Sequence, residues 1–248
     1  MVNQPADFKL ALSGKKILSF IITYNEAGAI KKVIDDIREF APYSDIVVID
    51  DCSTDNTVRI ARDAGVKVIS HLVNSRTAGY AAVKTAMIYA FQNNYDICCQ
   101  FDGDGQHDAA YLAKIIEPVA RGDFDMVIGS RFLGEAGYSP SFARATAIKI
   151  FSQITSLIIG QRICDISSGF KANGHKVIRL IALYPHLISD TNEMIIVTKF
   201  NGATILETPI KMRARETGKS WFSLTKYVLY PIKTMLYILA VIVRGRNE

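Results

Sequence analysis

The sequence predicts an α/β fold, built as a mostly parallel sheet with helices on both faces. Short apolar stretches rich in β-branched residues alternate with amphipathic stretches through the first half of the chain. The chain has 248 residues, of which 49% are hydrophobic, so it can bury a substantial core. It contains no internal repeat, low-complexity tract or Pro/Gly-rich linker that would divide it. Alternation of this kind is typical of parallel sheets covered by helices.

The first half contains five predicted strands, each followed by a helix or a loop. The strands are expected at 16–23, 45–50, 66–70, 95–101 and 124–130. The helices are expected at 25–40, 53–65, 77–93 and 109–121, the second of them ending at Gly65. In parallel sheets the ligand lies beyond the carboxyl ends of the strands. The segments TYNE, DDCSTD, DGDGQHD and GSRF each follow a strand, so we expect them along one edge.

The second half is less regular. We expect a long amphipathic helix at 141–160, a loop at CDISSGFKA, a short helix at 190–201 and a strand within ATILETPI. The stretch from 222 to 243 is apolar but broken by Pro231 and Lys233, and its uninterrupted part is shorter than the ~20 residues of a membrane span. With Arg244 and Arg246 beside it, this stretch predicts a helix on a membrane surface. A helix packed on the domain and a partner-binding helix are the alternatives.

These patterns predict one domain at 1–220 and an apolar, basic helical segment at 221–248. The net charge is +5, and from Lys199 onward nine Lys or Arg residues face three Asp or Glu residues. A basic tail favours an anionic surface or a phosphate-bearing substrate, although it also serves solubility. The four cysteines lack metal-binding spacing, and Cys98 and Cys99 fall within an apolar strand, where we expect them to be buried. With no signal-peptide pattern at the start, we expect a reducing, cytoplasmic environment.

The stretch QFDGDGQHD places Asp102 and Asp104 two residues apart at the end of a strand. A loop can turn both carboxylates toward one point, and Mg²⁺ is usually bound by one or two carboxylates plus substrate phosphates. An EF-hand is excluded, because His107 stands where that loop needs Gly and Ala113 where it needs Glu. Asp108 is the natural cap of the next helix, and we expect His107 to support the loop rather than to act in catalysis.

A second acidic group, VVIDDCSTDNT, brings Asp50 and Asp51 to the end of another strand. Carboxylates at such a place accept hydrogen bonds from a base or from ribose hydroxyls. Helix capping by Ser53, Thr54 or Asp55 would account for one residue of this group. It does not account for two successive aspartates at the end of the strand. The remaining histidines, His71, His175 and His186, show no partner pattern.

Six motifs in this order, TYNE, DDCSTDNT, DGDGQHD, VIGSRF, DISSGFKA and RETGKS, resemble those of family 2 glycosyltransferases with the GT-A fold, which is Rossmann-like. The resemblance is strongest to the polyprenol-phosphate sugar transferases, a group that includes dolichol-phosphate mannose synthase, and covers roughly residues 17–220. Cys52 departs from the family, which usually has Gly there. Trp221 departs from the mannose synthases, which tend to have Lys, and this weakens the case for a mannosyl product.

The resemblance implies a set of donor-binding residues. Asp102, Gly103 and Asp104 would hold the donor diphosphate, with Mg²⁺ or Mn²⁺ bound by Asp102, Asp104 and Gln106. The nucleoside would contact these residues: Tyr24, Asn25, Glu26, Asp51 and Asp50.

The resemblance also implies residues around the sugar and the acceptor. Arg131 and Arg144 would contact phosphate groups, and Arg215 and Ser220 match the flexible acceptor loop. Asp165 and Gly169 would lie by the sugar, and Glu193 matches an acid in the helix before the last strand. A hydroxyl acceptor requires a general base, for which Asp165, Asp190 and Glu193 are candidates. An acceptor that is already anionic requires no strong base.

We therefore expect a metal-dependent, inverting hexosyltransferase that uses a UDP- or GDP-linked sugar. The acceptor is expected to be polyprenyl phosphate or, alternatively, a lipid-linked saccharide in polysaccharide assembly. A sugar nucleotidyltransferase is disfavoured, because the first loop, TYNEAGA, lacks the Gly-rich stretch with Arg and Lys. A non-catalytic, membrane-associated nucleotide-binding scaffold is the alternative from another class. We expect the inner face of the membrane as the location, no nucleic-acid partner, and a membrane protein partner or a homo-oligomer.

Overall fold

The structure, a computed structural model, describes residues 6–75, 80–133, 142–188 and 191–214, together with 235, 236, 238–241 and 243. At 142–144 and 191–192 it describes the backbone alone. Four residues of the predicted site therefore lie partly or wholly outside the described part: Arg144, Asp190, Arg215 and Ser220.

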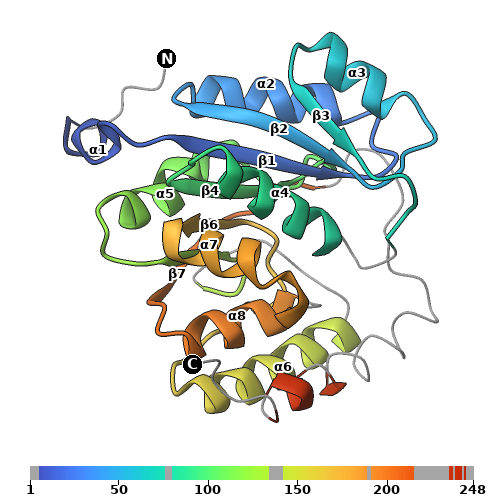
Figure 1. Cartoon of the computed structure of the whole chain (residues 1–248). Helices are drawn as coiled ribbons and strands as arrows, with labels where there is room; N and C mark the ends of the chain where they lie inside the picture. Colours follow the sequence, from blue (N-terminus) through green and yellow to red (C-terminus); the bar gives the residue numbers. More distant parts are fainter. Residues whose placement is uncertain are drawn as a thin grey trace.

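Within the described part, seven strands form one mixed sheet in the order β3-β2-β1-β4-β6-β5-β7 (Figure 1). In chain order they are β1 (Ile17–Thr23), β2 (Ser44–Asp50), β3 (Lys67–Ser70), β4 (Ile97–Asp102), β5 (Met126–Ser130), β6 (Lys171–Gly174) and β7 (Ile205–Pro209). Strand β1 pairs in parallel with both β2 and β4, and β5 pairs in parallel with β7. Strand β6 runs antiparallel to β4 and to β5.

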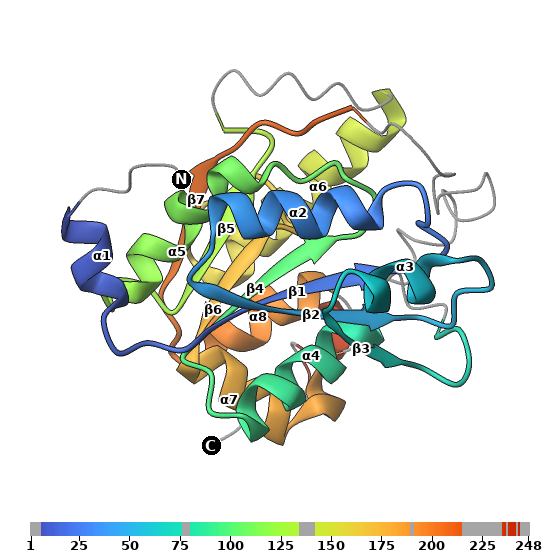
Figure 2. The same ribbon diagram turned by 90° about the horizontal axis from the view of Figure 1, so that it is seen from above.

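The helices cover both faces of the sheet, as the apolar strands predict. They are α1 (Ala6–Leu12), α2 (Ile30–Phe40), α3 (Thr57–Asp63), α4 (Tyr80–Gln92), α5 (Leu112–Ala120), α6 (Phe142–Ile159), α7 (His175–Leu183) and α8 (Thr191–Phe200), with 3₁₀ turns η1 (Ala109–Tyr111) and η2 (Pro185–Leu187). Figure 2 shows α2 and α5 on one side of the sheet and α4 and α7 on the other. The α/β fold class is thus confirmed.

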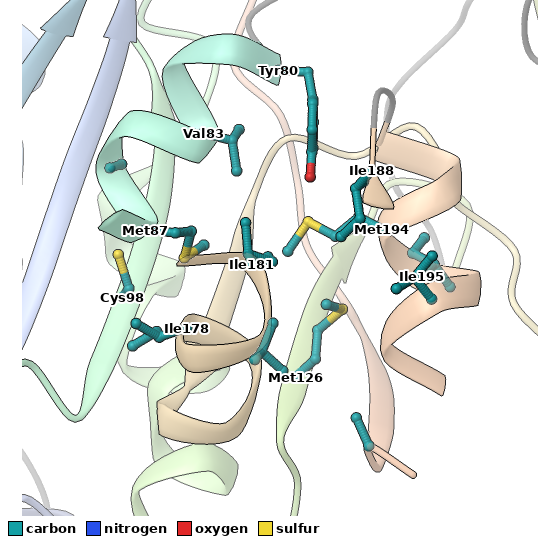
Figure 3. Packing of buried hydrophobic residues seen from close by; sticks show 14 of the residues in the cluster. Tyr80, Val83, Met87, Cys98, Met126, Ile178, Ile181, Ile188, Met194 and Ile195 are labelled. Carbon is teal, nitrogen blue, oxygen red and sulfur yellow. The ribbon is translucent and has the colours of Figure 1, made fainter. Parts of the chain in front are cut away.

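Two hydrophobic clusters fill the spaces between the sheet and its helices. One lies under α1, α2, α3 and α5. The other joins α4, α6, α7 and α8 and includes Met87, Ile178 and Ile181 (Figure 3). Full burial of an Ile or Met side chain contributes roughly 1.5–3 kcal/mol relative to exposure, so each cluster stabilises the sheet strongly. Cys98 and Cys99 are fully buried in these clusters, which confirms that expectation.

Two elements differ from the sequence-based expectation. The segment CDISSGFKA was predicted to be a loop, but its last two residues belong to β6, and α7 follows directly. Strand β6 has the sequence KANG, which has no β-branched residue, so no local preference indicates a strand. Its place between β4 and β5 supplies the pairing instead. The apolar spacing of Val177, Ile178 and Ile181 is helical and marks the buried face of α7.

The predicted domain boundary at 220/221 falls outside the described residues. Of the described C-terminal residues, Ile238 and Val241 pack into the same cluster as α6, α7 and α8. Leu236, Leu239 and Val243 are exposed. Within the described ranges, no helix is both long and apolar enough to cross a bilayer.

Candidate active site

Three strands bring their carboxyl ends to one edge. Thr23 at the end of β1 is in register with Asp50 at the end of β2, and Ile22 is in register with Asp102 of β4. The parallel pairing thus places TYNE, DDCSTD and DGDGQHD side by side, as the sequence predicts. This edge is the one at which open α/β sheets bind ligands.

The Asp102–Asp104 loop is fixed by close contact with β1. The Gly103 amide donates to the Ile22 carbonyl over 2.8 Å. A Cβ atom on Gly103 would lie 2.9 Å from Thr23 Oγ1 and 3.1 Å from the Ile22 oxygen, so only glycine fits. The Gln106 amide donates to Asp104 Oδ1 over 3.0 Å. These contacts give the loop a defined shape.

The Asp102 carboxylate faces the loop that follows α6. A Cβ atom on Gly169 would lie 2.9 Å from Asp102 Oδ2 and 3.1 Å from Oδ1, so any larger residue would crowd the carboxylate. The Asp102 side chain is 42% exposed, whereas Asp104 is nearly buried. The described residues contain no cluster of three or more His, Cys, Asp or Glu side chains suited to a metal ion. Two carboxylates and open space fit a Mg²⁺ or Mn²⁺ ion that takes its other ligands from phosphate and water.

His107 supports this loop, in agreement with the sequence-based expectation. Its Nδ1 accepts a hydrogen bond from the Asp102 amide over 3.0 Å, which leaves the proton on Nε2. Nε2 lies 3.6 Å from Asp102 Oδ2. The ring stacks on Phe170 with a centroid distance of 5.1 Å. His107 thus fixes the backbone of Asp102 while its proton faces the Asp102 carboxylate.

The surroundings act on the pKa of Asp102 in opposite directions. Loss of hydration raises the pKa, His107 opposes the rise, and the carboxylate of Asp104 adds to it. Because the Asp102 side chain is still 42% exposed, we expect only a modest net rise. A cation held by Asp102 and Asp104 would reduce the repulsion between their carboxylates.

Arg131 and Asp165 form a buried ion pair next to the acidic loop. Arg131 Nε and one terminal nitrogen donate to the two Asp165 oxygens over 2.7 Å each, and its amide donates over 3.0 Å. The terminal nitrogen also donates to Ser167 Oγ over 2.7 Å. Burial alone would raise the pKa of Asp165, but the hydrogen bonds and charge of Arg131 outweigh it and hold that pKa below its usual range. Phosphate binding by Arg131 stays a prediction.

Two residues of this region, one half-buried and one fully buried, have no counterpart in the sequence-based prediction. Glu207 of β7 accepts hydrogen bonds from the amides of Cys164 and Asp165 over 2.7 Å each, and burial raises its pKa. Lys171 of β6 is fully buried, donates to the Ser168 carbonyl, and lowers the pKa of both Asp102 and Asp165 by its charge. Both residues depend on pairing with β5, so only the sheet topology could have indicated them.

The nucleoside side of the edge is built from the β1 and β2 loops. Asn25 has a φ of 55°, and its side-chain oxygen accepts from the Thr54 amide over 2.8 Å. The Glu26 amide donates to Thr57 Oγ1, and the Tyr24 side chain is 43% exposed. Asp55 accepts from the amides of Ala27 and Thr57, so it links the β1 loop to the first residue of α3, whose N-cap is Asn56. The predicted nucleoside residues therefore lie together.

Asp50 and Asp51 are buried and already hydrogen-bonded. Asp50 accepts from the Ser53 amide. Asp51 accepts from His71 and from both the amide and the hydroxyl of Ser75. The expectation that His71 lacks a partner pattern is therefore wrong. The partners of His71 are Asp51, directly after β2, and Thr85 on α4, which lie too far along the chain for a local motif to reveal them.

Other predicted residues lie elsewhere. Asp108 accepts from the Ala110 amide over 3.1 Å and caps η1, which confirms its predicted role. Glu193 is buried in the first turn of α8. Burial lowers the pKa of Lys84 on α4, and the charge of Glu193 opposes this, so the two side chains are neighbours. The structure thus places Glu193 beside α4.

Residues 19–182 match the model of the family "Glycosyl transferase family 2". The chain belongs to glycosyltransferase family 2. It is 29% identical over 220 residues to an undecaprenyl-phosphate mannosyltransferase of Micrococcus luteus, covering 84% of this chain and 88% of the relative. It is 28% identical over 220 residues to a UDP-N-acetylglucosamine–dolichyl-phosphate N-acetylglucosaminyltransferase of Methanococcus voltae, covering 81% and 86%.

The fold is also that of a solved glycosyltransferase. The structure of glucosyl-3-phosphoglycerate synthase from Mycobacterium tuberculosis, in complex with Mn²⁺ and UDP-glucose, matches with a TM-score of 0.67 at 16% identity. The match covers 96% of this chain and 84% of that one. The glycosyltransferase therefore has the expected GT-A architecture, and its acidic loop follows the fourth strand of this fold.

Proposed function

We propose that this glycosyltransferase moves a sugar from a nucleotide-diphosphate sugar to polyprenyl phosphate, in one displacement that inverts the anomeric centre. The donor is bound at the β1, β2 and β4 ends, where Asp102 and Asp104 would hold Mg²⁺ or Mn²⁺, and the ion would supply positive charge that stabilises the leaving diphosphate. The named activities of the Micrococcus luteus and Methanococcus voltae relatives support this acceptor class.

The state of the carboxylates at the sheet edge is the observation that carries the proposal. Four carboxylates around the acidic loop are held by other groups: Asp50 by Ser53, Asp51 by His71 and Ser75, Asp165 by Arg131, and Glu207 by two amides. Asp165 in particular has a depressed pKa and a bidentate arginine, which makes it a poor proton acceptor. An acceptor that arrives ionised, such as a phosphate, needs no base at this edge.

The residues of the chain then have distinct tasks. Gly103 and His107 hold the Asp102–Asp104 loop in shape, and Gly169 keeps space beside Asp102. Arg131 and Lys171 bring positive charge close to the place where two phosphorylated substrates meet. Glu207 fixes the amides of Cys164 and Asp165 and so orients the carboxylate that holds Arg131.

The C-terminal residues support work at a membrane surface. Leu236, Leu239 and Val243 are exposed, and the sequence between Lys219 and Arg246 contains five basic and no acidic residues. An apolar face flanked by basic residues favours an anionic lipid interface. We propose that the enzyme binds the inner face of the membrane from the cytoplasm, close to its lipid acceptor.

A transfer assay tests the proposal. The full chain is incubated with Mn²⁺, labelled UDP- or GDP-sugars and polyprenyl phosphate, and label is counted in the lipid phase. We expect label only with the phosphorylated lipid, whereas free polyprenol of the same length, the matched control, gives none. Labelling of a lipid-linked saccharide but not of polyprenyl phosphate would contradict the proposed acceptor.

A further inference from the structure

The segment from His71 to Ser75, which we call the β3–α4 loop, is tied to the end of β2 by several hydrogen bonds. The His71 amide donates to the Asp50 carbonyl over 2.8 Å, and Asn74 Nδ2 donates to the Asp51 carbonyl over 2.9 Å. Ser75 donates to the Asp51 carboxylate from its amide, over 3.1 and 3.2 Å, and from its hydroxyl, over 2.9 Å. In contrast, the side chains of Leu72 and Val73 are 97% and 74% exposed. Polar contacts to Asp50 and Asp51, rather than apolar packing, therefore hold this loop.

Asp51 is the centre of these contacts. Its Oδ1 accepts from His71 and Ser75, and its Oδ2 accepts from the Ser75 amide and hydroxyl. A carboxylate offers about four acceptor positions, so these bonds use nearly all of its capacity. Asp51 is only 6% exposed. Its carboxylate therefore holds the loop, and its contact with a base or ribose stays a prediction.

His71 links this carboxylate to helix α4. Its Nδ1 lies 2.8 Å from Asp51 Oδ1 and donates to it, because the carboxylate can only accept. Its Nε2 lies 2.9 Å from the hydroxyl of Thr85 in the second turn of α4. The Thr85 hydroxyl also lies 3.1 Å from the Ala81 carbonyl, one turn earlier on the helix. The ring thus bridges the β2 end and α4, and its orientation is fixed from both sides.

We propose that His71 is a positioning residue of the donor site, which acts by holding Asp51 and, through it, the β3–α4 loop in the shape that binds the nucleotide. The inference rests on the proposed function in one respect, that a nucleotide is the donor. The loop follows β3 at the same sheet edge as Tyr24, Asn25 and the acidic loop. A preformed loop spares the ligand the entropy of ordering it, so loss of the link weakens binding.

The test compares four forms of the full chain: the wild type, His71→Ala, His71→Asn and His186→Ala. Asn keeps an N–H group close to the position of Nδ1, so it can still donate to Asp51. His186 is an exposed histidine on η2 and serves as the matched control. Two quantities are measured: hydrogen exchange in a peptide spanning 71–75, and the affinity for UDP and GDP with Mn²⁺ by calorimetry.

We expect His71→Ala to speed exchange in the loop and to weaken nucleotide binding about tenfold, the usual cost of losing a supporting partner. We expect His71→Asn to keep most of the loop's protection from exchange and most of the nucleotide affinity. His186→Ala is expected to match the wild type in both measurements. In turnover, the donor KM of His71→Ala rises while kcat stays within about twofold, because the loop acts on binding.

Three outcomes overturn the inference. If His71→Ala exchanges and binds like the wild type, His71 does not position the loop. If exchange rises but nucleotide affinity stays unchanged, the link exists and has no role in donor binding. A wild type that binds neither nucleotide contradicts the proposed function and the donor-site role together, and exchange still reports whether His71 holds the loop.

Discussion

The two halves of the sheet hold their buried carboxylates in different ways. On the β3-β2-β1 side, Asp50 and Asp51 are satisfied by backbone amides, a serine hydroxyl and His71. On the β6-β5-β7 side, Asp165 is paired with a full charge, that of Arg131. The first side can therefore lose one hydrogen bond at a time, whereas loss of Arg131 on the second side leaves the buried charge of Asp165 uncompensated.

The acidic loop at the end of β4 lies between these halves. Loss of the Asp104 charge in this loop has the largest expected effect on activity. We expect Asp104→Asn to lower the rate of nucleoside-diphosphate release from the donor by about 10³-fold, because a charged group at the developing diphosphate is worth roughly 3–4 kcal/mol. Steady-state release of nucleotide with Mn²⁺ measures this effect.

Asp108→Asn is the matched control in the same loop. Asn also caps helices, so the η1 start is retained, and we expect activity close to that of the wild type. An Asp104→Asn enzyme with wild-type turnover would show that Asp104 is not part of the grip on the donor.

The ion pair on the β6-β5-β7 side should dominate stability. We expect Arg131→Met to lower the free energy of unfolding by about 3–5 kcal/mol, because Asp165 is then buried without its partner. Denaturant unfolding followed by circular dichroism measures the change.

Arg121 makes a similar pair with Glu117 on the surface, where solvent screens it, so Arg121→Met is the control and should change stability little. Equal losses for the two variants would contradict the contrast between a buried and an exposed pair. A double variant, Arg131→Met with Asp165→Leu, should recover much of the loss, because no charge is left unpaired.

The same pair predicts a pH dependence that the β3-β2-β1 side need not share. The folded-state pKa of Asp165 lies below its unfolded value of roughly 3.9, so its contribution is fully present above that value. The contribution is lost as the pH falls through the lower, folded-state pKa. We expect the free energy of unfolding of the wild type, relative to that of the double variant, to be constant from pH 7 to pH 5 and to fall below pH 4, as measured by unfolding at each pH. A wild type that gains stability relative to the double variant in acid would contradict the depressed pKa.

The Gly169→Ala substitution has the smallest expected effect. It tests the contact between the loop that follows α6 and the Asp102 carboxylate. A methyl group there would press on the Asp102 carboxylate at 2.9 Å, so we expect Gly169→Ala to turn Asp102 away and weaken Mn²⁺ binding about tenfold. Calorimetric titration of Mn²⁺ in the presence of UDP measures it. Gly160→Ala, where a Cβ atom meets nothing within 4 Å but φ is +64°, is the control, with a stability cost and unchanged metal affinity.

The sequence predicts the β3-β2-β1 side far better than the other. Each strand from β1 to β5 is a local apolar run followed by a polar loop, so strand ends and site residues such as Asp50, Asp102 and Asp104 can be placed by pattern alone. Strand β6 is short, polar and antiparallel, and only its neighbours define it. Lys171 lies on β6 and was therefore missed. Glu207 lies on a predicted strand and was missed because the amides that it binds, those of Cys164 and Asp165, are 43 and 42 residues away.

His71 was missed for a related reason. Its partners, Asp51 and Thr85, lie 20 and 14 residues away in sequence, and no spacing rule links them. Cys52 illustrates a departure that the structure explains in part. It adopts a φ of 67°, the left-handed conformation that favours the glycine usual in related sequences. The turn keeps its shape with cysteine, at a cost of roughly 1–2 kcal/mol.

The central claim is that the Asp102–Asp104 loop holds a nucleoside diphosphate through a divalent ion. The most direct measurement is the melting temperature of the wild type with UDP or GDP, with and without Mn²⁺, since a ligand of the native state raises it. We predict a clear rise for one of the nucleotides only when Mn²⁺ is present, and no such rise in Asp104→Asn. An equal rise without the metal, or in the Asp104→Asn variant, would contradict the claim.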